Sequence, residues 1–241
     1  MMGMPIAIEI IDPEGEEAHI DEVLAYFHYI DETFSTYKTH SEISRINNNE
    51  LDLAAASDDM KEVFALSDET KRLTRGYFDI ARPAGGYDPS GLVKGLAIHR
   101  GAEILRGHGL KNFYVEIAGD IQICGKNSQD EAWKIGIRNP ANNNEVVKIL
   151  KLSDCGIATS GTYVRGAHIY DPLAPDRQLE EIVSLTVLGP NVYEADRFAT
   201  AAFAMGPEGI NFIASLPGFE GYMIDRRGRA TMTAGFSAYA T

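Results

Sequence analysis

The spacing of apolar residues changes along this chain in long blocks, and the order of these blocks constrains the fold. Ile6, Ile8 and Ile10 alternate with other residues, which predicts an opening strand. Helical spacing follows over residues 18–34, where apolar side chains recur three and four positions apart. Further helices are predicted over 57–73 and 90–107, and strands over 113–123, 133–137, 146–152 and 182–188.

Capping residues support the boundaries of one of these helices and predict a further helix. Ser57 is a good N-cap, and Gly76 stands just beyond the end of the helix that it begins. Asn191 begins a helix after the last long strand, with Glu194 three residues later as in a capping box and Gly206 past its end. These signals predict that both segments are helical in the folded protein.

The predicted elements come in mixed runs, and a short helix over 208–216 and a hairpin around 226–228 close the chain. A doubly wound sheet would alternate strands and helices regularly, so this order indicates the α+β class. At 241 residues the chain can bury a sizeable core, and no linker or repeat divides it. We therefore expect a single domain over 1–241.

Composition excludes several classes of function. The chain has 22 basic and 35 acidic residues and a formal charge of -13, which argues against a nucleic-acid surface or a polybasic membrane patch. Cys124 and Cys155 lack metal-ligand spacing and fit a reducing compartment. No signal peptide or membrane span is visible, so a cytoplasmic location is expected, unless an exported protein has been trimmed.

Residues 158–172 are rich in hydroxyls, with a glycine, aromatic rings, an imidazole and a carboxylate. Such a run of donors and acceptors predicts a site for a phosphorylated or nucleotide-like ligand. His168 titrates near neutral pH and stands close to Asp171, so a base supported by a carboxylate is one interpretation. A structural hydrogen-bonding role is the other interpretation of His168.

Asp196 and Thr200 are four residues apart on the helix that Asn191 caps, so their oxygens point the same way. A carboxylate and a hydroxyl are hard ligands that suit Mg²⁺. The pair by itself is equally consistent with a solvated helix face.

Two further segments carry weaker signals. Gly91 and Lys94 stand near the start of the helix over 90–107, where glycine permits close backbone approach and lysine supplies a charge for a phosphate. Phe78 and Asp79 follow the preceding helix and would suit a ring and a hydrogen-bond donor, although Phe78 also suits a core.

Taken in order, these segments resemble the ApbE family, the FAD:protein FMN transferases. The matching segments are 2–3, 34–37, 41–47, 76–79, 88–95, 118–120, 159–161, 168–172 and 195–200. The resemblance covers nearly the whole chain, and the ordered set is specific although each segment is short. It implies the family's own α+β arrangement, related to the T-fold, in one compact unit.

The resemblance also implies a reaction and its residues. Members move FMN from FAD to a threonine or serine hydroxyl of a target flavoprotein and leave AMP. Mg²⁺ would be bound by Asp196 and Thr200 with a backbone carbonyl near Gly91. His168 would act as the base, with Asp171 orienting it. The residues that would line the FAD site are Tyr37, Phe78, Asp79, Asp88, Lys94, Gly119, Asp120, Thr159, Ser160, Gly161 and Ile169.

Three features depart from the family pattern. Ala118 replaces the first glycine of a Gly-Gly-Asp motif, only eight residues separate Asp79 from Asp88, and no export signal is visible. The short connection favours keeping an Mg-dependent FAD pyrophosphatase as an alternative, because water would reach the phosphates more easily. A non-catalytic flavin-binding protein is a third possibility, although a pure carrier needs no metal at the pyrophosphate.

Overall fold

A computed structural model describes residues 3–161 and 169–241. Its main element is a seven-stranded sheet in the order β1-β2-β3-β6-β7-β8-β9, with every neighbouring pair antiparallel. The strands are β1 (Ile6–Ile10), β2 (Phe113–Ile117), β3 (Asp120–Cys124), β6 (Cys155–Gly161), β7 (Ile182–Gly189), β8 (Glu220–Asp225) and β9 (Ala230–Met232). A separate two-stranded sheet contains β4 (Trp133–Asn139) and β5 (Asn142–Leu152).

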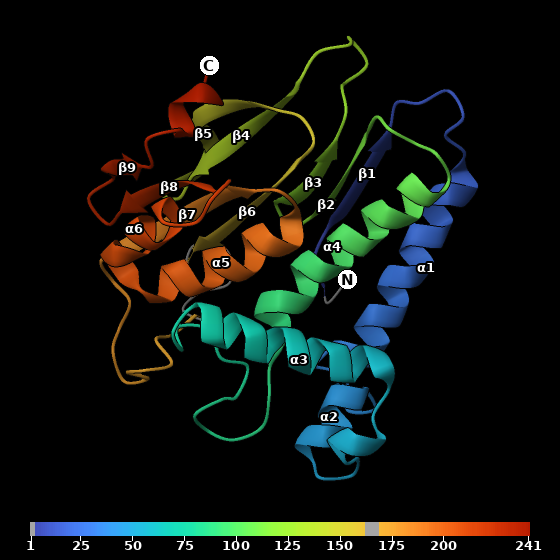
Figure 1. Ribbon diagram of the computed structural model, residues 1–241, viewed down its shortest axis with the longest axis vertical. Helices are drawn as coiled ribbons and strands as arrows, with labels where there is room; N and C mark the ends of the chain where they lie inside the picture. The colour runs from blue at the N-terminus through green and yellow to red at the C-terminus, as the bar shows by residue number, and fades with distance from the viewer. Residues whose placement is uncertain (1–2, 162–168) are drawn as a thin grey trace.

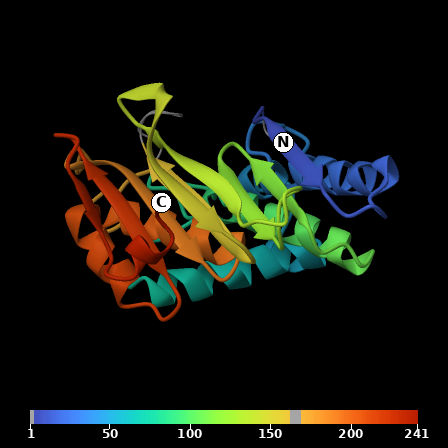
Figure 2. The same ribbon diagram turned by 90° about the horizontal axis from the view of Figure 1, so that it is seen from above.

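Helices cover one face of the large sheet, and the β4–β5 hairpin lies over the other (Figures 1 and 2). The helices are α1 (Glu17–Phe34), α2 (Glu42–Asn47), α3 (Asp58–Leu73), α4 (Ser90–Gly107), α5 (Val192–Ala204) and α6 (Gly209–Ala214). This arrangement of segregated helices and antiparallel strands confirms the α+β prediction.

The predicted caps lie at the helix ends that they were expected to form. The Met60 N–H donates to Ser57 Oγ over 3.2 Å, and the Glu194 N–H donates to Asn191 Oδ1 over 2.9 Å. The capping box of α5 is only half present, because the carboxylate of Glu194 pairs with Arg197. Side chains on one stripe of α1, such as Phe27, are fully buried, which is what its helical spacing requires.

The core consists of three clusters on the two faces of the large sheet. The first packs α1 and α4 against β1 and β2, and the second packs α5 and α6 against β7 and β8. The third lies beneath the β4–β5 hairpin and includes Trp133, Leu150 and Phe236. Because all three share the sheet, each face is covered by apolar contacts.

Two segments differ from the expected elements. The predicted strand over 113–123 is a hairpin, because Ala118 and Gly119 have φ angles of 53° and 95° and reverse the chain. Residues 155–161 form a central strand, whereas the sequence predicted only a polar segment over 158–172 and no strand here. Side chains along β6 alternate between the two faces of the sheet, so Thr159 lies on the opposite face from Ala158, which packs into the core with α5.

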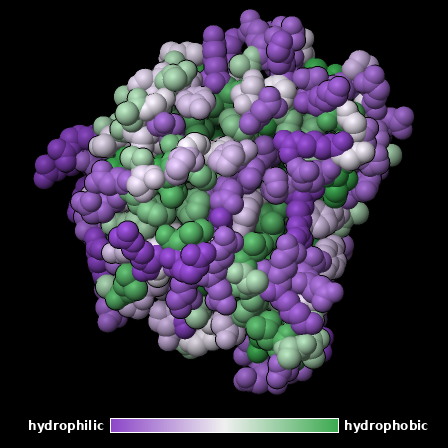
Figure 3. Space-filling model, viewed as in Figure 1, coloured by the Kyte–Doolittle hydropathy of each residue, from purple (hydrophilic) through white to green (hydrophobic). Residues whose placement is uncertain are grey.

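Hydrophilic residues occupy most of the face seen in Figure 1, with apolar patches between them (Figure 3). Among the residues that the structure describes, no helix is both long and apolar enough to cross a membrane.

Candidate active site

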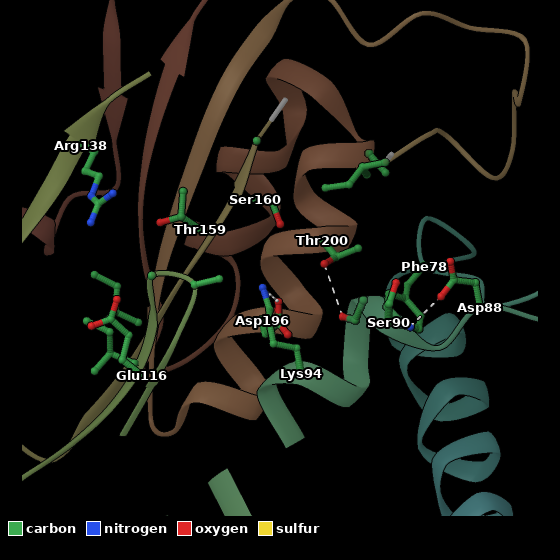
Figure 4. Close-up of a pocket in the computed structure, with 18 of the residues that line it drawn as sticks. Phe78, Asp88, Ser90, Lys94, Glu116, Arg138, Thr159, Ser160, Asp196 and Thr200 are labelled. Atoms are coloured by element: carbon green, nitrogen blue, oxygen red, sulfur yellow. Dashed lines mark hydrogen bonds and ion pairs between the residues drawn. The ribbon is translucent and has the colours of Figure 1, made fainter. Parts of the chain in front are cut away.

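A cavity of about 740 Å³ opens between the β4–β5 hairpin, the end of β6 and the crossing of α4 with α5. Figure 4 shows three groups of side chains around it: Phe78 and Asp88 on one side, Lys94, Asp196 and Thr200 in the centre, and Glu116 and Arg138 on the other. The predicted residues that line the cavity are Phe78, Asp79, Asp88, Gly91, Lys94, Gly119, Thr159, Ser160, Gly161, Ile169, Asp196 and Thr200.

Lys94 is the centre of a buried charge cluster. Its ammonium group forms an ion pair with Asp120 and lies 3.5 Å from Asp196 Oδ1. Both carboxylates are almost completely buried, whereas Lys94 lines the cavity. Burial raises the pKa of Asp196, as does the nearby Asp120 carboxylate, while Lys94 opposes the shift. One lysine thus balances two carboxylates, and an additional cation at Asp196 would be favoured electrostatically.

Gly95 allows α4 and α5 to cross closely enough to form this cluster. A Cβ atom at residue 95 would lie 2.6 Å from the Asp196 Cβ and 2.9 Å from the Val192 carbonyl oxygen. The Gly95 N–H donates to Asp196 Oδ2 over 2.8 Å. Gly91, which was expected to allow close approach of a ligand, lines the cavity, whereas Gly95 approaches the neighbouring helix.

Oxygen atoms of three chemical types lie near the point where α4 crosses α5. The Thr200 hydroxyl donates to the Gly91 carbonyl over 3.4 Å, and the Asp196 carboxylate lies one turn away on α5. A hydroxyl, a carbonyl and a carboxylate are the donors that Mg²⁺ prefers, and water or phosphate oxygens complete its octahedron. The residues present therefore fit a magnesium ion. No group of three or more His, Cys, Asp or Glu side chains in the described part of the chain offers a separate metal site.

The end of β6 forms one wall of the cavity. β6 pairs with β3 only through residues 155–157, and beyond them the Thr159 N–H donates to Asp120 Oδ1 over 2.9 Å. The Thr159 hydroxyl bonds to that of Thr186 over 2.9 Å. Asp120 thus satisfies the open edge of β6 and also binds Lys94, so it connects the strand to the charge cluster.

Loop carboxylates define the opposite end of the cavity. Asp88 Oδ1 accepts from the Ser90 N–H over 3.1 Å at the start of α4. Asp79 accepts from the Ala81 N–H over 2.9 Å and lies 2.6 Å from Lys71 Nζ. Phe78 is buried in the core cluster and also lines the cavity, so its core role is confirmed and its contact with a ligand ring stays a prediction.

Of the predicted residues that the structure describes, Tyr37, Asp120 and Asp171 are not among those that line the cavity, although Asp120 binds Lys94 there. Tyr37 is 88% exposed and lies beside Lys38, away from the cavity. Asp171 is buried, accepts from the Leu173 N–H over 2.9 Å and lies 3.4 Å from Arg177, so it holds the turn after the polar segment. His168 lies outside the described residues, and its role as the base stays a prediction.

Glu116 and Arg138 also line the cavity, although they were not predicted from the sequence. Glu116 lies on β2 between the buried residues Val115 and Ile117, and its side chain points to the cavity face of the sheet. Burial raises its pKa, Asp120 adds to the shift, and Arg138 of β4 opposes it. The signal in the sequence was a carboxylate alternating with the apolar residues of a strand.

The sequence of this chain is similar to those of proteins named FAD:protein FMN transferase. A protein named FAD:protein FMN transferase, from Haemophilus influenzae, is 25% identical over 95% of this chain and 84% of its own length. One of the same name from Vibrio cholerae is 35% identical over 50% of this chain, and the match spans only 39% of that relative's length.

Solved structures have the same fold. The flavin transferase ApbE from Vibrio cholerae matches with a TM-score of 0.84 and 24% identity over 98% of this chain and 96% of its own. The ApbE protein from Thermotoga maritima matches with a TM-score of 0.86 and 19% identity over 100% of this chain and 97% of its own. The model of the ApbE family matches residues 2–85 and 82–223, so the chain belongs to the ApbE family.

Proposed function

We propose that this protein transfers FMN from FAD to a threonine or serine hydroxyl of a target flavoprotein and releases AMP. The observation that carries the proposal is the position of the Lys94 cluster in the middle of the cavity, with a separate group of side chains on either side (Figure 4). A dinucleotide has the same distribution, with a charged pyrophosphate between two ring systems. The names of the matching relatives support FAD as the substrate.

The oxygens of Gly91, Asp196 and Thr200 would hold Mg²⁺ against the pyrophosphate. Such an ion stabilises the negative charge that develops on the phosphate oxygens during transfer. Lys94 would add a second positive charge where that charge develops. Asp120 holds the Lys94 ammonium group in place, since the two form a buried ion pair.

The hydroxyl of the acceptor is a weak nucleophile at neutral pH, so its proton must be removed during attack. We assign this step to His168, and Asp171 supports the proposal because it holds the turn that follows His168 in the chain. The P–O bond to the FMN phosphorus forms as the bond to AMP breaks, and no covalent enzyme intermediate is required.

The test incubates the protein with FAD, Mg²⁺ and a candidate acceptor flavoprotein, and follows AMP release and acceptor mass. Transfer adds one FMN to the acceptor for each AMP released. AMP without a labelled acceptor would indicate the pyrophosphatase, and neither product would indicate a binding protein. Replacing His168 by Ala should abolish transfer while FAD binding persists; full transfer by this variant would exclude the base.

A further inference from the structure

β4 is an edge strand on the side that faces away from β5. Among the described residues it pairs with β5 alone. The other edge of the hairpin is covered by the end of the chain, where the Lys151 N–H donates to the Tyr239 carbonyl over 2.8 Å and the Thr241 N–H donates to the Ile149 carbonyl over 3.0 Å. In the part of the chain that the structure describes, the unpaired backbone groups of the hairpin therefore lie along β4.

The open edge of β4 borders the cavity. Five consecutive residues, 134–138, line it. Side chains of a strand alternate between its faces, so one face alone would contribute every second residue. Ile137 is buried in the core beneath the hairpin, whereas Lys134 and Gly136 are exposed. Because residues from both faces of β4 line the cavity, the backbone edge of this strand forms the cavity wall.

The middle of this edge carries no side chain. Gly136 lies at the centre of the five residues, and Val146 of β5 packs across it, 3.1 Å from where a Cβ would be. Native sheets protect open edges with prolines, charges, bulges or covering segments. Here Lys134 and Arg138 stand at the two ends of the segment and a bulge lies near Arg138, whereas Gly136 between them is exposed.

We propose that an extended segment of the acceptor flavoprotein, carrying the threonine or serine to be modified, adds to β4 as a third strand. The inference rests on the proposed function, because that reaction requires a protein hydroxyl to enter the cavity. An extended segment has unpaired N–H and C=O groups on its edge, which match those of β4. Antiparallel or parallel addition would run the segment along the cavity wall and direct alternate side chains into the cavity.

Hydrogen–deuterium exchange of the whole protein tests this placement. The probe is an acceptor domain that the wild-type protein labels, with its target threonine changed to valine so that the complex does not turn over. In the free protein, outward amides of 134–138 should exchange fast and those bonded to β5 slowly. With FAD, Mg²⁺ and the probe present, the outward amides should slow by about tenfold or more. Protection by FAD and Mg²⁺ alone would overturn the proposal, because the edge would then belong to the nucleotide.

Proline variants give a second measurement. Gly136 pairs with Ile149, whose carbonyl accepts from the Thr241 N–H on the far side of β5. The two residues therefore form a non-hydrogen-bonded pair, and Gly136→Pro removes an outward N–H of β4. That variant should raise the KM for the acceptor about tenfold or more and leave FAD affinity unchanged. Met232→Pro, on the edge strand β9 away from the cavity, is the matched control and should change neither value. The N–H of Met232 points outward, because this residue lies next to the pair in which the Thr233 N–H donates to the Gly221 carbonyl.

The outcomes separate this inference from the proposed function. If the acceptor is labelled but neither the β4 amides nor the proline variant respond, strand addition is wrong and FMN transfer stands. If no acceptor is labelled by the wild-type protein, the proposed function fails and strand addition fails with it.

Discussion

Gly95 shows how one residue without a side chain positions the centre of the site. We expect Gly95→Ala to lower the free energy of unfolding by about 1–3 kcal/mol, because the new Cβ would collide with Asp196 and the Val192 backbone and force α4 from α5. Gly107→Ala is the matched control, since nothing lies within 4 Å of a Cβ there. Urea unfolding measures both variants, and equal stability for the two would contradict the tight crossing.

A substitution of the single residue Thr200 tests the proposed metal ligands. Thr200→Val keeps the shape of the side chain but removes the oxygen near the Gly91 carbonyl. We expect the Mg²⁺ concentration for half-maximal AMP release to rise about 10- to 100-fold, as for other changes at metal sites. Thr33→Val is the control, because Thr33 bonds to the Tyr29 carbonyl within α1, outside the cavity wall. An unchanged Mg²⁺ requirement for Thr200→Val would remove Thr200 from the ligand set.

At the scale of elements, the β2–β3 turn lines the cavity and has a strained backbone. Ala118 has a φ of 53°, a region that disfavours residues with a Cβ. We expect Ala118→Gly to raise the free energy of unfolding by about 0.5–1 kcal/mol, since the strain relieved exceeds the entropy cost of glycine. Ala132→Gly should instead destabilise, because Ala132 has no positive φ. Equilibrium unfolding in urea would contradict this explanation if both substitutions destabilised the protein equally.

Helices and strands were predicted to different degrees, for a physical reason. The bounds of α3 and α4 follow from local signals, namely the Ser57 cap, apolar periodicity and a terminal glycine, and the structure confirms them. β6 was missed because its residues Thr159 and Ser160 are polar. That strand is stabilised by pairing with β3 and β7, which lie far away in the sequence.

At the scale of the molecule, burial of the two cysteines links stability to pH. Burial raises the pKa of Cys124 to about 11 and that of Cys155 to about 12. The unfolded thiols titrate near pH ~8.5, so folding holds protons that the unfolded chain releases. This contribution to stability is complete below that pH and is lost as the pH rises toward the folded values.

We therefore expect the free energy of unfolding to fall between about pH 9 and pH 11, and to fall less steeply in the Cys124→Ala/Cys155→Ala variant. The comparison with the variant isolates the thiols from the tyrosines and lysines that titrate in the same range. Urea unfolding at several pH values measures both slopes, and parallel slopes would show that the thiols do not contribute.

By itself, the sequence determined the α+β class, most helix boundaries and the ordered motifs that resemble the family, because caps and apolar periods act over a few residues. The sequence also identified Asp196 and Thr200 as candidate metal ligands, and their four-residue spacing on one helix places both in the cavity wall. Only the tertiary structure decided that Lys94 and Asp120 form an ion pair, that Glu116 and Arg138 face the cavity, and that the edge of β4 borders it. These features depend on contacts between residues far apart in the chain, which no local pattern encodes.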